Sequence, residues 1–337
     1  DALPISMANE AALKYLLLGA FSTGFLLYGI SLLYGATGST LLPTIISEIQ
    51  QNGSGNPLVI VGMALVVVAM SFKIAIVPFH MWTPDVYTGA PTPVTGFLSG
   101  AAKAAGFAVF IRVLMTGIPL EGANWENILW LLAVLTMTVG NVMALRQNDV
   151  KRMLAYSSIA HAGYVLVAVV VGSTSAISGV IFYSCAYALM GTGAFGILTI
   201  RDAGRIPRTF DDLAGYGKRN PTLALLMSLF VFSLVGLPLT GGFIGKFQIF
   251  SAALQEGWIW LTVIAILNSA LSVYYYLRVV MFMYMRDGAL PEGSVVSNNT
   301  SGFAMTGLLG TALAVLYLGV FPDRILELAS LSILALL

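Results

Sequence analysis

Three lysines lie deep inside long apolar runs of this sequence: Lys73, Lys103 and Lys246. A charge at the centre of a bilayer costs about 2.5–3.5 kcal/mol on insertion scales, so a chain that keeps such charges usually uses them. Burial favours the neutral form of a lysine, whereas a nearby carboxylate favours its charged form. A row of buried lysines can therefore pass protons, and these residues predict a proton relay.

No acidic residue lies at comparable depth in an apolar run of this sequence. The acidic partner of the lysines is therefore expected in a segment before Asp1 or in another subunit. The remaining alternative is that there is no acidic partner and the lysines are neutral. The chain does not begin with an initiator, and residues 1–7 do not form a signal peptide. Either Met7 is the initiator or the chain is a fragment of a longer protein, and we expect the second, an N-terminally truncated chain.

Two histidines could extend such a relay, because imidazole titrates near neutral pH. Lys73 and His80 are seven residues apart, which predicts one shared helix face with about 10 Å between them along the axis. His161 lies inside an otherwise apolar helix. Structural roles compete with these: Lys73 could snorkel to the membrane surface, His80 could cap a helix end, and Lys246 could bond carbonyls freed by a helix break.

Lys103 is harder to explain structurally, because the surrounding small residues from Ser99 to Gly106 let helices pack closely and leave it no easy path to water. Glu10 and Lys14 have the i,i+4 spacing of an ion pair at the start of the first span. This pair predicts a helix-end contact.

The composition predicts an integral membrane protein. Of the 337 residues, 58% are hydrophobic and 9% are charged, and the mean hydropathy is +0.89; a soluble domain has about 25% charged residues. The net charge of +1 gives no sign of nucleic-acid binding. The single cysteine, Cys185, excludes an intrachain disulfide and a cysteine-based iron–sulfur site. Two scattered histidines are too few for a metal site, so we expect no cofactor on this chain.

About nine spans follow from a requirement of about 20 apolar residues per crossing. They are residues 11–36, 57–80, 92–116, 127–146, 153–172, 175–200, 221–254, 258–285 and 303–321. The stretch 325–337 is expected to be an interfacial helix or the start of a further segment.

Basic residues gather in the loops on the side where the first span begins, which we call side A. They are Arg146, Lys151, Arg152, Arg201, Arg205, Arg208, Lys218, Arg219 and Arg286. The positive-inside rule then makes side A cytoplasmic and places the C-terminus on the outer side. Trp82 is expected in the aromatic belt of side A and the other four tryptophans in the opposite belt.

Two spans contain helix breakers next to a lysine. Residues 221–254 are too long for one straight crossing, and the proline and glycines in their middle predict two half-helices, with Lys246 just after the break. In residues 57–80 a proline follows Lys73 by five positions. The residues expected to form the two breaks are Pro78, Pro238, Gly241 and Gly242. Paired interrupted helices are typical of transporters built from repeats.

Three stretches resemble the antiporter-like membrane subunits of respiratory complex I, the NADH:quinone oxidoreductase. They are residues 72–94, 145–164 and 237–246, and the match is closest to the subunit N branch of this family. The resemblance implies an all-α polytopic membrane protein with about nine transmembrane helices of a fourteen-helix antiporter-like fold, which has inverted repeats and two broken helices. It implies that residues 1–116 end the first repeat, 117–285 form the second, and 286–337 form the final helix and tail.

The resemblance also implies roles for individual residues. Lys73 and Lys246 match the broken-helix lysines of the two repeats, and Lys103 matches the connecting lysine between them. His80 and His161 match polar positions on a central hydrophilic axis. Two further positions, Glu10 and Lys14, match the start of the family's sixth helix. The key glutamate of the family lies on the preceding helix, which this chain lacks.

The implied function is proton translocation in the bacterial inner membrane, coupled to quinone reduction elsewhere in the complex. NADH, flavin, iron–sulfur clusters and quinone would then bind to the complex, with no redox chemistry on this chain. The implied partners are the other membrane and peripheral subunits, including neighbouring antiporter-like subunits. The alternatives are a subunit of a multi-subunit sodium/proton antiporter, a subunit of an ion-pumping membrane hydrogenase, and a purely structural scaffold. The sequence of residues 79–85 favours complex I.

Overall fold

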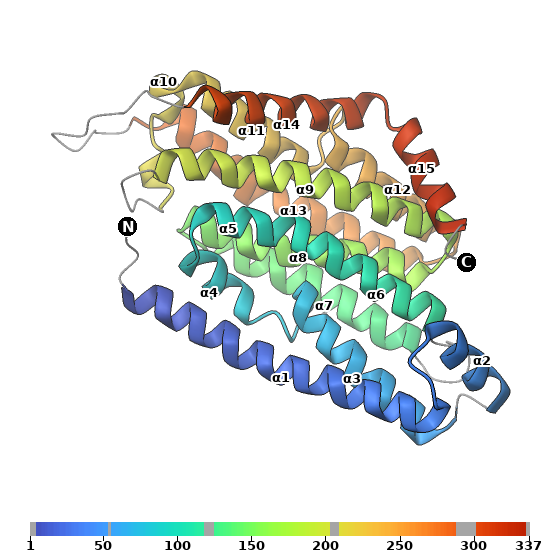
Figure 1. The fold of residues 1–337 in the computed structure, drawn as a ribbon. Coiled ribbons are helices and arrows are strands. Elements are labelled where there is room, and N and C mark those ends of the chain that lie inside the picture. Colours follow the sequence, from blue (N-terminus) through green and yellow to red (C-terminus); the bar gives the residue numbers. More distant parts are fainter. Residues whose placement is uncertain (1–4, 53–54, 118–124, 203–208, 288–300, 335–337) are drawn as a thin grey trace.

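The computed structural model describes residues 5–52, 55–117, 125–202, 209–287 and 301–334. These residues are almost entirely helical, and the described ranges contain no β-strand beyond an isolated bridge between Asp149 and Thr209. Long helices lie side by side, with the start of α1 and α10 at one end of the bundle and α2 and α15 at the other (Figure 1). The prediction of an all-α polytopic fold is confirmed.

The helices have the following bounds: α1 Ile5–Thr37, α2 Leu42–Asn52, α3 Pro57–Ile74, α4 Trp82–Gly89, α5 Thr92–Phe97, α6 Lys103–Gly117, α7 Trp125–Leu145, α8 Val150–Val171, α9 Thr174–Asp202, α10 Tyr216–Arg219, α11 Pro221–Val235, α12 Gly241–Gln255, α13 Ile259–Met285, α14 Gly302–Val320 and α15 Asp323–Leu334. A π-helical turn, Leu98–Ala102, joins α5 to α6.

Eight helical stretches in the described ranges are long and apolar enough to cross a membrane. The shorter apolar helix α11, together with α12, corresponds to the ninth expected span. Arg205 and Arg208, which the sequence assigned to a loop on side A, lie outside the described residues. The expected interfacial segment near the C-terminus forms α15, which turns away from α14 (Figure 1).

Helix α8 forms the centre of the core. Almost every residue from Met153 to Val170 is buried. Asp149 caps the start of the helix, accepting a hydrogen bond from the backbone N–H of Arg152 at 2.8 Å. Because the helix is surrounded by protein, its serines, histidine and tyrosines face other helices. The polar groups of α8 therefore have to find partners inside the bundle.

Helices α7 and α8 approach closely at two glycines. A Cβ atom on Gly140 of α7 would lie 2.5 Å from the backbone nitrogen of Ala160, and one on Gly163 of α8 would lie 2.8 Å from the Cα of Met137. Small residues at such positions let helix backbones approach each other. This close contact fixes α8 relative to α7.

Both expected helix breaks are present, and they share one cap geometry. Helix α3 ends at Ile74, Ala75 adopts a left-handed conformation (φ 62°), and the N–H of Ile76 bonds to the carbonyl of Ser71 at 2.9 Å. Helix α11 ends in the same way: Gly236 is left-handed (φ 92°), and the N–H of Leu237 bonds to the carbonyl of Phe232 at 3.0 Å. Both are Schellman caps, on helices that run in opposite directions (Figure 1).

The second break depends on glycines where its two half-helices meet. Pro238 lies in the connection, and α12 begins at Gly241. The N–H of Gly242 donates to the Ser233 hydroxyl at 3.2 Å, and a Cβ atom on Gly242 would overlap the Ser233 carbonyl. A Cβ atom on Gly241 would lie 3.0 Å from the Cβ of Leu318. The predicted roles of these residues in the break are consistent with this packing.

The expected position of Trp82 in an aromatic belt is wrong. Its side chain is only 3% exposed and packs between Tyr15 and Phe72, with ring centroids at 5.1 and 5.4 Å. Its indole N–H donates to the carbonyl oxygen of Phe72 at 2.8 Å. That carbonyl lies in the last turn of α3, where it also accepts from the N–H of Ala75 at 3.1 Å in the cap. Trp82 therefore stabilises the first break from inside the protein.

The predicted shared helix face of Lys73 and His80 is also wrong. Helix α3 ends at Ile74, one residue after Lys73, and His80 lies in the turns that lead to α4. The left-handed residue Ala75 redirects the chain between them. Pro78 lies in this connection, as expected for the first break.

Candidate functional site

Lys103 is buried at the start of α6, directly after the π-helical turn. The residue is only 4% exposed. Its ammonium donates to the Ser158 hydroxyl at 2.6 Å and to the Ser158 carbonyl at 2.9 Å. The ring centroid of Tyr87 lies 5.9 Å from the Nζ atom. π-helical turns inside α-helices often occur at functional sites. Two oxygens and an aromatic face thus replace a carboxylate as the partners of this lysine.

His161 is buried on α8 and contacts two tyrosines from other helices. Its Nε2 atom lies 2.9 Å from the hydroxyl of Tyr276 on α13, and its Nδ1 atom is hydrogen-bonded to the hydroxyl of Tyr183 on α9. The Tyr276 hydroxyl is also bonded to the Ser157 hydroxyl. His161 therefore joins α8, α9 and α13 through groups that exchange protons.

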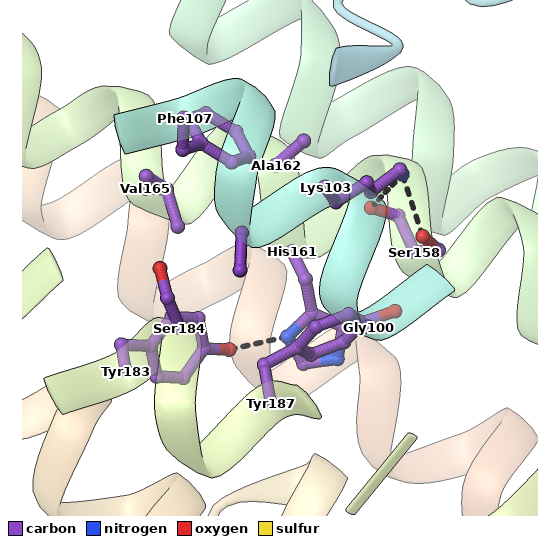
Figure 2. Close-up of a pocket in the computed structure, with 11 residues that line it drawn as sticks. Gly100, Lys103, Phe107, Ser158, His161, Ala162, Val165, Tyr183, Ser184 and Tyr187 are labelled. Atoms are coloured by element: carbon purple, nitrogen blue, oxygen red, sulfur yellow. Dashed lines mark hydrogen bonds between the residues drawn. The ribbon is translucent and has the colours of Figure 1, made fainter. Parts of the chain in front are cut away.

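Lys103 and His161 line the same pocket. Its volume is about 20 Å³, room for about one water molecule, and its lining includes Ser158, Tyr183 and Tyr187. Figure 2 shows the lysine–Ser158 and His161–Tyr183 bonds on the wall of this pocket. Most of the lining is apolar, so a water molecule here would depend on the few polar atoms of Lys103, Ser158 and His161. The structure thus brings together two residues that are 58 positions apart in the sequence.

Lys246 is buried on α12 just after the second break. Its ammonium donates to the carbonyls of Leu234 and Val235 at 3.0 and 2.8 Å, and to the Ser269 hydroxyl at 3.0 Å. Those carbonyls end α11, where the helix dipole is negative. The ring centroid of Tyr164 lies 5.1 Å away. In this conformation Lys246 bonds to carbonyls freed by the helix break, which is the structural role that the sequence left open for it.

The expected ion pair of Glu10 and Lys14 is confirmed, and it belongs to a larger cluster. The Lys14 ammonium lies 2.7 Å from a Glu10 carboxylate oxygen and 2.7 Å from Asp85 Oδ2. The Arg152 guanidinium lies 2.7 Å from Asp85 Oδ1. Burial raises the pKa of the Asp85 carboxyl, but the hydrogen bonds from Lys14 and Arg152 outweigh burial and lower it. The cluster ties α1 and α4 to the start of α8.

Lys73 and His80 do not join the pocket of Lys103 and His161. Lys73 is exposed at the surface of the described bundle. It lies beside α6: a Cβ atom added to Gly106 would lie 3.7 Å from the Cγ atom of Lys73. His80 is half-buried, and its Nδ1 atom is buried without a hydrogen-bond partner among the described residues. These two residues lie near the first break, at the edge of the described bundle.

Sequence reasoning missed most partners of the candidate site residues. They are Asp85, Tyr87, Ser158, Tyr164, Tyr183, Ser269 and Tyr276. Tyrosines recur in the apolar helices α9 and α13, including the i,i+4 pair Tyr183 and Tyr187. A hydroxyl in an apolar membrane helix needs a hydrogen-bond partner. These tyrosines were therefore the feature of the sequence that could have indicated partners for the site residues.

Residues 5–272 match a family model described as the transmembrane family of NADH:quinone oxidoreductase and Mrp antiporters. The chain belongs to this family of antiporter-like membrane proteins. Its curated relatives include NADH-quinone oxidoreductase subunit N of Trichlorobacter lovleyi, which is 50% identical over 97% of this chain and 67% of the relative. The chain spans about two thirds of the length of such relatives. The expected kinship with the subunit N branch, an antiporter-like membrane subunit of the complex I enzyme, is confirmed.

Solved structures agree with this placement. A chain of respiratory complex I from Thermus thermophilus with bound aureothin is 37% identical, with a TM-score of 0.79 over 94% of this chain and 68% of that chain. A chain of the Mrp complex from Dietzia sp. has a TM-score of 0.84 over 95% of this chain and 67% of that chain, but is only 22% identical. The Mrp likeness shows a common fold. The complex I likeness extends to sequence.

Proposed function

We propose that this chain translocates protons as a membrane subunit of NADH-quinone oxidoreductase. The observation that carries the proposal is the common pocket of Lys103 and His161, which brings a buried amine and a buried imidazole to one small cavity. Both groups can hold and release a proton. Family membership indicates the source of energy for this transport. Quinone reduction elsewhere in the complex would drive conformational changes that the subunit uses to move protons.

The contacts support an ordered set of proton steps. Lys103 bonds to Ser158 on the pocket wall, and water in the pocket would carry a proton from there to His161. His161 is bonded to Tyr276 and meets the Tyr164 ring edge-on, with centroids at 5.6 Å. The Tyr164 ring in turn lies against the Lys246 ammonium. The proposed order is therefore Lys103, His161 and Lys246. The ring of Tyr164 carries no exchangeable proton, so the step from His161 to Lys246 would pass through water or hydroxyl groups.

Lys73 and His80 are proposed to belong to the first-repeat part of the relay, where Lys73 faces outward from the described bundle. Glu10 and Lys14 are proposed to act at the side A end through Asp85. Because Asp85 contacts both Lys14 of α1 and Arg152 of α8, a change of charge here would be felt by the helix that carries His161.

The two capped breaks support the proposed repeat boundaries. Residues 1–116 are assigned to the end of one repeat, 117–285 to the second, and 286–337 to the final helix and tail. The caps at Ala75 and Gly236 have the same pattern of backbone bonds on oppositely directed helices. This is the relation expected of inverted repeats that each contain a broken helix.

The proposed location is a bacterial inner membrane, with side A in the cytoplasm and the C-terminus outside. Lys218 and Arg219 of α10 lie at the same end of the bundle as the start of α1 (Figure 1). This clustering of basic residues supports the orientation. NADH, flavin, iron–sulfur clusters and quinone are assigned to other parts of the complex. Its other membrane and peripheral subunits are the proposed partners.

The Lys103→Ala variant tests the proposal in membrane vesicles that contain the complete complex. We expect NADH-driven proton uptake and coupled quinone reductase activity to fall. Lys218→Ala is the matched control, because Lys218 is 74% exposed and its ion pair with Asp287 lies outside the spans. If the assembled Lys103→Ala complex pumps normally, the relay assignment is wrong. Sodium-dependent transport without NADH would favour an antiporter instead.

A further inference from the structure

A buried amide, Asn141, lies at the meeting point of three helices. It is fully buried on α7, and its Nδ2 atom donates to the Tyr164 hydroxyl of α8 at 3.0 Å and to Asn268 Oδ1 of α13 at 3.3 Å. Its Oδ1 atom accepts a hydrogen bond from the Tyr275 hydroxyl of α13 at 2.9 Å. A further bond runs from Nδ2 to the carbonyl of Met137 at 2.8 Å in its own helix. The two hydrogens on Nδ2 are shared among these three acceptors, and Oδ1 is engaged by Tyr275.

The two tyrosines that Asn141 holds lie beside the two ends of the proposed relay step. The ring of Tyr164 faces the Lys246 ammonium at 5.1 Å. The ring of Tyr275 packs on that of Tyr276 at a centroid distance of 4.5 Å, and the Tyr276 hydroxyl lies 2.9 Å from His161 Nε2. One side chain thus constrains a neighbour of Lys246 and a neighbour of His161.

We propose that Asn141 is a positioning residue that sets the charge balance between His161 and Lys246 by orienting Tyr164 and Tyr275. The inference rests on the proposed relay and deepens it. An aromatic face near a desolvated ammonium stabilises the charged lysine. The Lys246 ammonium also donates to two carbonyls of α11 and to the Ser269 hydroxyl of α13, and His161 of α8 lies close enough to interact with it electrostatically. A displaced Tyr164 ring therefore changes the protonation of Lys246.

The chemistry of the amide suits this role. An amide donates to one tyrosine and accepts from the other while remaining uncharged. A carboxylate could accept from Tyr275 but could not donate to Tyr164, and it would add a charge near Lys246. An apolar side chain would leave two buried hydroxyls without this partner. Asn141 can therefore hold both tyrosines without adding a proton-binding group.

The variants Asn141→Leu, Tyr164→Phe and their double combination test the proposal in vesicles that contain the complete complex. The readouts are protons taken up per NADH oxidised and the pH profile of that uptake. In Asn141→Leu and in Tyr164→Phe the charged form of Lys246 loses the stabilisation that the Tyr164 ring provides. We therefore expect the alkaline limb of the pH profile of proton uptake to move to lower pH, by up to about one unit. If both act through one contact, the double variant should shift no further than Asn141→Leu.

Ser228→Ala is the control, because this buried hydroxyl bonds only to Ala224 of its own helix in the described contacts. Tyr164→Phe removes a single oxygen and keeps the test decisive if Asn141→Leu does not assemble. An unchanged pH profile in assembled Tyr164→Phe overturns the proposal, as does a double variant with the summed shifts. The Lys246→Met variant distinguishes failure of the proposed relay from failure of the role of Asn141. Normal proton pumping in Lys246→Met refutes the relay itself. Reduced pumping in Lys246→Met, together with an unaltered pH profile in Tyr164→Phe, refutes only the role of Asn141.

Discussion

The ammonium group of Lys103 on α6 donates to both the hydroxyl and the carbonyl oxygen of Ser158 on α8. This contact spans 55 residues of sequence and links the helix after the first break to the buried centre of the bundle. It gives the lysine two oxygen partners without neutralising its charge. In the proposed relay, a proton on Lys103 would lie beside the pocket that also contains His161, held by hydrogen bonds to Ser158 and not by an ion pair in the described contacts.

Ser158→Ala should weaken this contact and leave the carbonyl bond in place. A hydrogen bond to a charged group contributes about 1.5–3 kcal/mol, and 1.4 kcal/mol corresponds to about a tenfold change in an equilibrium. We expect NADH-driven proton uptake to fall by about tenfold or more in vesicles with the complete complex. Ser251→Ala, which removes a bond within α12, is the control. Equal uptake in the two variants would argue against a role for the Ser158 hydroxyl.

Gly163→Ala should destabilise the bundle, because its Cβ atom would lie 2.8 Å from the Cα and Cβ of Met137 on α7. Overpacking of this kind costs about 1–3 kcal/mol. We expect a lower thermal midpoint of the purified complex and less assembled subunit. Gly310→Ala on α14 is the matched control, since no atom lies within 4 Å of its Cβ position. A Gly163→Ala complex as stable as the control would show that α7 and α8 are less tightly packed.

Asp85→Asn should lower the stability of the side A end in a pH-dependent way. Burial alone would raise the pKa of the Asp85 carboxyl, but Lys14 and Arg152 hold it below its ordinary value of 3.8. The stabilisation from the charged carboxylate is therefore fully present above about pH 4 and is lost as the pH falls through the lowered pKa. The effect is modest, because the ion pairs are partly exposed.

Thermal unfolding of the purified complex between pH 7 and pH 3 measures this dependence. The midpoint of Asp85→Asn should lie below that of the unmodified protein at pH 7, and the difference should narrow as the pH falls below 3.8. A difference that stays constant across this range would show that the carboxylate charge of Asp85 is not the stabilising feature.

Features that depend on local sequence were predictable. The proline and glycines of residues 236–242 exclude a continuous helix, so the second break and the position of Lys246 beside it followed directly. The i,i+4 spacing predicted the ion pair of Glu10 and Lys14. Local patterns also mislead: Lys73 and His80 have helical spacing, but a left-handed Ala75 separates them, and nothing in its side chain signals that conformation.

Contacts between distant residues were not predictable from one sequence. Asp85 meets Lys14 across 71 residues, and His161 meets Tyr276 across 115. Such pairs depend on which helix faces meet, and α8 is buried on all sides, so no amphipathic pattern marks its partners. Trp82 was misplaced for a related reason: its indole donates to the Phe72 carbonyl in the cap of α3, a contact that only the folded break creates.

The proton-to-electron ratio of the double variant Lys103→Met/Lys246→Met tests the central claim most directly. It should be measured with both single variants, using the complete purified complex in liposomes. If the two lysines are successive stations of one relay joined through His161, each single variant lowers the ratio and the double variant lowers it no further. An unchanged ratio in either assembled single variant, or a double variant with the summed loss, would contradict a single relay.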